Sequence, residues 1–182
     1  MKKIALIGTH GIGKTTTSYG LAHMLKKLRY NAIVLNETAR ECPLPINQKG
    51  TEKSQKWILG KQLMNEAVIH PSVDFAICDR TILDVMVYSE YSNIKLSNAI
   101  RQFVLHHLKT YDTIFYLPIR PEYFKGDGQR SGDESYQQWV DKRFRFYVNN
   151  LDFDFVVVKN DDNVLNRIMY YLGRKYNLIK KE

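Results

Sequence analysis

The sequence predicts an α/β protein in which helices cover a parallel β-sheet. Two observations support this prediction. Five short apolar segments with strand character recur along the 182 residues, and stretches with helical spacing lie between them. A glycine-rich turn also joins the first strand directly to a helix, and such alternation of strands and helices is typical of parallel sheets.

The predicted strands span residues 4–7, 32–35, 73–78, 113–117 and 153–158. The predicted helices span residues 14–29, 52–69, 97–109 and 162–176; one more begins after Thr81, and another contains Arg143 and Arg145. Each of the four bounded helices carries an apolar stripe that we expect to face the core. The stripes are Leu21, Leu25 and Leu28; Trp57, Met64 and Ala67; Ile100, Phe103, Val104 and Leu108; and Val164, Ile168, Tyr171 and Leu172.

The turn after the first strand has the pattern G-x-x-x-x-G-K-T over residues 8–15. This pattern cradles nucleotide phosphates when it follows a strand and opens a helix, which is its position here. Its glycines let backbone N–H groups converge on one anion, Lys14 reaches the outer phosphates, and Thr15 supplies a hydroxyl ligand for Mg²⁺. The alternative is a glycine-rich turn without a ligand. The expected nucleotide-binding residues are Gly8, His10, Gly11, Ile12, Gly13, Lys14, Thr15 and Thr16.

Glu37 and Arg40 follow the second predicted strand. Loops at the carboxyl ends of parallel strands build the ligand crevice, so we expect Glu37 to lie at the same edge as the phosphate loop. There its carboxylate could take a proton from a substrate hydroxyl, and Arg40 could hold an anionic group of the substrate. The alternative is an acidic first turn, in which Glu37 merely favours the start of a helix.

Asp79 and Arg80 end the third predicted strand. A carboxylate at this position could position Mg²⁺ together with Thr15, and it is a second candidate for the catalytic base. Arg80 could clamp the substrate. The competing structural explanation is a capping box formed by Thr81 and Asp84, which accounts for those two residues but not for a charged pair at the end of an apolar strand.

Residues 118–132 are predicted to form a loop around Gly126, Asp127 and Gly128, and a mobile lid is expected over about residues 120–135. Arg130 would move with this lid and neutralise the charge of a migrating phosphoryl group, while Asp127 and Arg143 are further candidates for substrate binding. The alternatives are a solvated surface loop and, for Arg143, an ordinary surface ion pair. Residues 43–50 are also predicted to be a loop at the crevice.

Composition limits the classes of protein that fit. A chain of 182 residues suits one domain, and no apolar run is long enough to cross a bilayer. Cys42 and Cys78 have no metal-type spacing, so we expect a reducing, cytoplasmic setting. The formal net charge of +8 favours anionic partners, which keeps nucleic acid open beside small molecules. A homodimer is compatible with the sequence.

In the order in which they occur, these motifs resemble those of P-loop kinases of nucleosides and nucleotides over nearly the whole chain. The chain looks most similar to ribosylnicotinamide-kinase-like ATPases, whose Glu-x-x-Arg-Glu and Asp-Gly-x-Arg segments match residues 37–41 and 127–130. Asp79-Arg80-Thr81 is similar to a triplet of deoxynucleoside and thymidylate kinases. The resemblance implies a three-layer P-loop NTPase fold with sheet order 2-3-1-4-5, the ligands ATP and Mg²⁺, and Glu37 as general base.

The leading hypothesis is therefore a phosphotransferase that acts on a nucleoside or nucleotide, with Lys14, Glu37, Asp79 and Arg130 as catalytic residues. Glu37, Arg40, Arg80, Asp127 and Arg143 would bind the substrate, and Thr15 and Asp79 would hold the metal. Two alternatives stay open: a kinase that acts on DNA, at a modified base or an end, and a nucleotide-dependent ATPase switch. Lys159-Asn160-Asp161-Asp162 lacks the order of a guanine-reading motif, which disfavours a GTPase.

Overall fold

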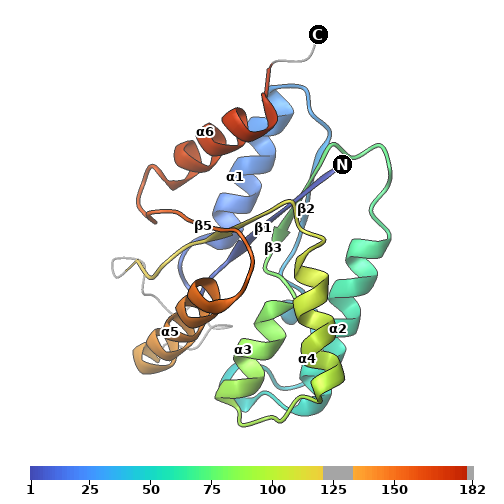
Figure 1. Ribbon diagram of the computed structural model, residues 1–182, viewed down its shortest axis with the longest axis vertical. Helices are drawn as coiled ribbons and strands as arrows, with labels where there is room; N and C mark the ends of the chain where they lie inside the picture. Colours follow the sequence, from blue (N-terminus) through green and yellow to red (C-terminus); the bar gives the residue numbers. More distant parts are fainter. Residues whose placement is uncertain (121–132, 180–182) are drawn as a thin grey trace.

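A computed structural model describes residues 1–120 and 133–179 of the chain. Within these residues, five parallel strands form one sheet in the order β2-β3-β1-β4-β5 (Figure 1), which confirms the order that the family resemblance implied. The strands are β1 (Lys2–Ile7), β2 (Ala32–Leu35), β3 (Phe75–Asp79), β4 (Thr113–Tyr116) and β5 (Phe155–Val157).

The central strands are apolar because both faces of the sheet are covered. Ile4 of β1 lies opposite Ile77 of β3 on one side and Thr113 of β4 on the other. Every residue of β3 and β4 is buried, whereas β5 at the edge of the sheet is only partly covered. These continuous runs are what made the strands recognisable in the sequence.

Helices cover the sheet in two outer layers, so the predicted three-layer α/β architecture is confirmed (Figure 1). One face packs against α1 (Lys14–Lys27) and α6 (Val164–Tyr176), which lie side by side. The opposite face packs against the remaining described helices, which are α2 (Glu52–Ala67), α3 (Leu83–Tyr91), α4 (Asn98–Leu108) and α5 (Glu134–Asn150).

The stripe predicted for α2 is wrong. Met64 is 65% exposed and Ala67 is exposed as well, and Trp57 is only partly buried. The fully buried positions of this helix are instead polar: Ser54, Gln55, Gln62 and Glu66. The side chains of Ser54, Gln62 and Glu66 have hydrogen-bond partners inside the fold, and the apolar residues that pack on the core are Ile58, Leu59 and Leu63. The spacing of Trp57, Met64 and Ala67 could not reveal this inward side of the helix.

The other predicted stripes agree more closely with the structure. Ile168 and Leu172 of α6 and Leu21 and Leu25 of α1 are buried in one core cluster. On α4, Phe103 is 43% exposed, and its ring stacks on His107 instead of entering the core.

The cap predicted before α3 is formed with a small change of partners. Thr81 Oγ1 accepts a hydrogen bond from the Leu83 N–H, and the Asp84 carboxylate accepts one from the Thr81 N–H. Two short 3₁₀ turns, η1 (Thr38–Glu41) and η2 (Asn47–Lys49), lie in the segment between β2 and α2. No described helix is both long and apolar enough to cross a membrane.

Candidate active site

The phosphate loop follows β1 and keeps its shape through three glycines with positive φ: Gly8 (136°), Gly11 (71°) and Gly13 (87°). Other residues rarely adopt such angles, so the glycines are needed on conformational grounds. Gly8 is also required sterically, because a Cβ there would lie 2.4 Å from the Leu117 carbonyl oxygen. Gly13 then leads directly into α1, whose N-terminus therefore faces the loop.

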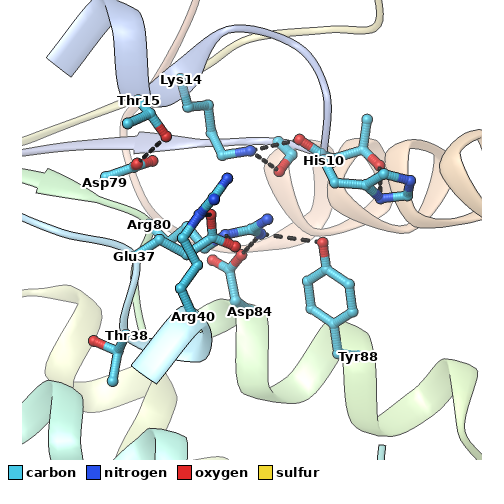
Figure 2. A network of polar contacts seen from close by, with 12 residues as sticks. His10, Lys14, Thr15, Glu37, Thr38, Arg40, Asp79, Arg80, Asp84 and Tyr88 are labelled. Atoms are coloured by element: carbon cyan, nitrogen blue, oxygen red, sulfur yellow. Dashed lines mark hydrogen bonds and ion pairs between the residues drawn. The ribbon is translucent and has the colours of Figure 1, made fainter. Parts of the chain in front are cut away.

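Lys14 lies inside the loop, where it is 4% exposed. Its Nζ donates hydrogen bonds to the carbonyl oxygens of Gly8 (3.0 Å) and Thr9 (2.5 Å), as Figure 2 shows. Burial, assisted by the charge of Arg80, lowers the pKa of Lys14 to about 7, although nearby Asp79 and Glu37 favour the charged form. The geometry therefore places the amino group of Lys14 where the outer phosphates of a nucleotide would lie.

Thr15 and Asp79 are brought together as predicted for the metal site. Thr15 Oγ1 donates a hydrogen bond to Asp79 Oδ2 at 2.5 Å (Figure 2). Asp79 is 1% exposed, and its other oxygen, Oδ1, is buried without a hydrogen-bond partner. A hydroxyl and a carboxylate with an unused oxygen fit Mg²⁺, which commonly takes one or two protein oxygens together with phosphate oxygens and water.

Arg80 directly follows β3 and occupies the left-handed region, with φ of 92°. This strained backbone is held by a hydrogen bond from the Arg80 N–H to the Leu6 carbonyl (3.1 Å). The buried guanidinium then bonds to Glu37 Oε1 (2.7 Å), to the Asp84 carboxylate and to the Tyr88 hydroxyl (3.1 Å). Arg80 therefore links β2, β3 and α3 around one charged centre (Figure 2).

Glu37 lies between two guanidinium groups, because its second oxygen accepts a hydrogen bond from Arg40 Nε (3.0 Å). Burial alone would raise the pKa of Glu37, but the charges of Arg80 and Lys14 and the bond from Arg40 outweigh it and lower this pKa to about 2. The carboxylate is therefore ionised at neutral pH. Burial raises the pKa of Asp84.

A small cavity of about 40 Å³ opens beside Glu37 and Arg80. Sequence reasoning missed several of its lining residues, among them Gln55 of α2 and Val85 and Tyr88 of α3. No motif marks them; only the packing of α2 and α3 brings them to the pocket.

A second, more open pocket of about 550 Å³ lies on the other side of the phosphate loop. Gly11 and Gly13 line it together with the segment after β5, residues 160–162. Arg120 also lines this pocket, and its guanidinium binds the Asp162 carboxylate at 2.5 Å. The phosphate loop therefore lies between two cavities, one towards α2 and α3 and one towards α6.

Some predicted residues lie elsewhere or outside the described ranges. Arg143 forms an ion pair with Glu90 of α3 and packs over Phe146; it is not among the residues that line the pocket beside Glu37. Arg143 is therefore engaged in an ion pair, the alternative considered for it, and this pair with Glu90 is partly buried. The His10 ring packs against Tyr136 with centroids 5.0 Å apart. Asp127, Arg130 and most of the expected lid fall outside the described residues.

With this geometry established, comparison with known proteins defines the class. Residues 3–164 match the family described as AAA domain, and the chain belongs to that family. Family and fold together confirm the predicted resemblance to the superfamily of P-loop, nucleoside-kinase-like proteins. No curated protein has a significantly matching sequence.

Solved structures with the same fold include deoxyadenosine kinase from M. mycoides with bound dATP, at 23% identity and a TM-score of 0.68, covering 95% of this chain and 100% of that one. The same kinase with bound dCTP has 25% identity and a TM-score of 0.63, covering 94% and 99%. The NadR protein in complex with NR has 20% identity and a TM-score of 0.68; the alignment covers 94% of this chain but 52% of NadR.

Proposed function

We propose that this protein is an ATP- and Mg²⁺-dependent kinase that phosphorylates a nucleoside. The observation that carries the proposal is that Glu37 belongs to both halves of the site. Its carboxylate lines the enclosed pocket, and it is close enough to Lys14 of the phosphate loop for the two charges to affect each other's pKa. An acceptor in that pocket would meet a triphosphate on the loop at this carboxylate.

The donor side is assigned by its chemistry. ATP would place its phosphates on residues 8–16 and its base in the pocket towards α6, beside Asn160. Thr15 and Asp79 would hold Mg²⁺, which supplies charge neutralisation at the phosphates. Lys14 would exchange its bonds to the Gly8 and Thr9 carbonyls for bonds to the outer phosphates, and the predicted contribution of Arg130 would add to this neutralisation.

The acceptor side favours Glu37 over Asp79 as the base. Asp79 is engaged with Thr15, whereas Glu37 faces the pocket from which the hydroxyl would approach. The low pKa of Glu37 means that it is ionised and ready to accept a hydrogen bond from that hydroxyl. Phosphoryl transfer through a loose transition state requires positioning more than early deprotonation, so a weakly basic carboxylate is sufficient.

Charge in the pocket distinguishes a nucleoside from a nucleotide. Among the described residues that line it, the charged side chains are Glu37, Asp84 and Arg80, and Arg80 already binds both carboxylates. Within this described lining, a monophosphate group would therefore meet carboxylates whose cation, Arg80, is already paired. An uncharged ribose or deoxyribose hydroxyl meets no such obstacle. The structural neighbours include a deoxyadenosine kinase, which agrees with this assignment.

A transfer assay with labelled ATP·Mg²⁺ tests the proposal. We expect label on one or more nucleosides, much less on the corresponding monophosphates, and none with Lys14→Ala, because that variant lacks the cation of the phosphate loop. Circular dichroism checks that the variant is folded. Equal transfer by Lys14→Ala, or transfer only to DNA or to no acceptor at all, would contradict the proposed function.

A further inference from the structure

Two side-chain amides hold the phosphate loop from outside, and neither belongs to the loop motif. Gln137 of α5 donates a hydrogen bond through Nε2 to the His10 carbonyl at 2.9 Å. Asn160, after β5, donates through Nδ2 to the Ile12 carbonyl at 3.1 Å and to the Pro118 carbonyl at 2.9 Å. We propose that Gln137 and Asn160 are positioning residues that orient two N–H groups of the loop towards the bound phosphates.

The argument rests on the geometry of single peptide units. In a trans peptide the C=O and the following N–H point in opposite directions, and the described residues contain no cis peptide. Because Gln137 binds the His10 carbonyl, the N–H of Gly11 must point away from α5. Because Asn160 binds the Ile12 carbonyl, the N–H of Gly13 must point away from the segment after β5.

Without these two hydrogen bonds, the His10–Gly11 and Ile12–Gly13 peptide units could rotate. Gly11 and Gly13 have positive φ and no side chain, so nothing in the loop itself prevents their peptide planes from turning over. A turned peptide would present a carbonyl oxygen to the phosphates and repel them. The hydrogen bonds from Gln137 and Asn160 to the two carbonyl oxygens exclude the turned conformation, and the two amides do not occupy the phosphate site.

The Gln137 amide is well placed for such a role. It is 2% exposed, and a Cβ on Gly11 would lie 3.3 Å from its Nε2, so the contact is close. The preceding residue, Tyr136, is fully buried and packs on the His10 ring and within 6.2 Å of the Tyr88 ring, which binds Arg80. The start of α5 thereby contacts both the donor and the acceptor side.

The test uses magnesium tripolyphosphate as the probe, because Asn160 also lines the pocket assigned to the base and tripolyphosphate has none. Gln137→Met keeps the length of the side chain without its donor, and Asn160→Ala removes the second amide. Gln138→Met and Asn166→Ala are matched controls, since both amides are exposed. Calorimetry should show about 3- to 10-fold weaker binding for each test variant, the usual effect of one hydrogen bond, and less than about 2-fold for the controls.

Amide ¹H–¹⁵N spectra separate positioning from a general structural role. Tripolyphosphate should move the Gly11 and Gly13 amide protons of the wild type downfield; Gln137→Met should reduce the shift of Gly11 alone, and Asn160→Ala that of Gly13 alone. Variants that bind like the wild type, or that lose both shifts equally, would overturn the inference. The inference rests on the proposed function only because it requires a polyphosphate ligand. A wild-type protein that binds neither tripolyphosphate nor ATP would contradict both the inference and the proposed function.

Discussion

At the residue scale, Lys14 is held by partners that a bound anion could replace. Its ammonium is buried and bonded to the carbonyls of Gly8 and Thr9, which are weaker partners than phosphate oxygens. Burial, followed by repulsion from Arg80, lowers the pKa of Lys14 to about 7, so its neutral form is populated near neutral pH. A polyphosphate would restore the charged form, because it places negative charge beside the amine.

Binding of ATP·Mg²⁺ should therefore take up protons above pH 7. A group whose pKa rises on binding takes up protons at pH values between its free and bound pKa values. The affinity for ATP·Mg²⁺ should therefore fall by up to about tenfold per pH unit above pH 7. Below pH 7, the titration of Lys14 should change the affinity little. Calorimetry at pH 8 in two buffers with different ionisation enthalpies measures the uptake. Lys14→Arg is the control, because arginine stays protonated. The absence of proton uptake by the wild type would contradict the assignment.

At the scale of an element, α2 is unusual because its buried side is polar. Glu66 accepts hydrogen bonds from Lys3 Nζ (2.7 Å), the Tyr111 hydroxyl (2.5 Å) and Gln62 Nε2 (2.9 Å). Burial alone would raise the pKa of Glu66, but bonds from His107, Lys3 and Tyr111 lower it to about 2. Gln62 also accepts a bond from Thr38 at 2.5 Å, and both residues line the acceptor pocket. This network therefore ties the pocket to β1 and α4.

Glu66→Ala should destabilise the protein by about 3–5 kcal/mol, because it leaves the buried Lys3 ammonium without its carboxylate. Glu52→Ala, on the same helix, is the matched control: Glu52 is exposed and pairs with Lys56, so its loss should leave the free energy of unfolding nearly unchanged. Urea denaturation at pH 7 measures both free energies of unfolding. Similar values for the two variants would show that the buried network contributes little.

For the whole molecule, the question is what the net charge of +8 does. The described active site balances its own charges: Arg80 and Arg40 bind Glu37, and Asp84 binds Arg80. Much of the excess lies instead near the ends of the chain, for example at Lys2 and Arg174. A small acceptor that enters the pocket beside Glu37 therefore contacts the charge-balanced active site and not the excess positive charge near the ends of the chain.

Salt therefore distinguishes the two kinds of acceptor. For the nucleoside that accepts phosphate, we expect kcat/KM measured at saturating ATP·Mg²⁺ to change less than about threefold between 50 and 200 mM salt, since the pocket binds an uncharged group. A DNA acceptor would release counterions from several phosphates, and its affinity would fall by orders of magnitude over that range. A steep fall in kcat/KM for the acceptor would revive the nucleic-acid alternative.

Much of the fold and of the candidate active site could be predicted from local sequence. The apolar runs of β1, β3 and β4 predict buried parallel strands because strands that are covered on both faces read as nearly continuous apolar runs. Residues 8–15 predict the phosphate loop because glycine positions and the following helix are local requirements. Glu37, Asp79 and Arg80 were predicted to meet because parallel strands deliver their carboxyl ends to one edge.

Only the tertiary structure decided which partners the remaining side chains take. Gln55, Gln137 and Asn160 belong to no motif, yet folding brings them to the pocket or to the loop. The inward polar face of α2 and the Arg143–Glu90 pair were likewise beyond prediction. The physical reason is the same for all of them: a strand or a loop follows from its own residues, whereas a hydrogen bond or an ion pair between distant segments depends on where the whole chain places both.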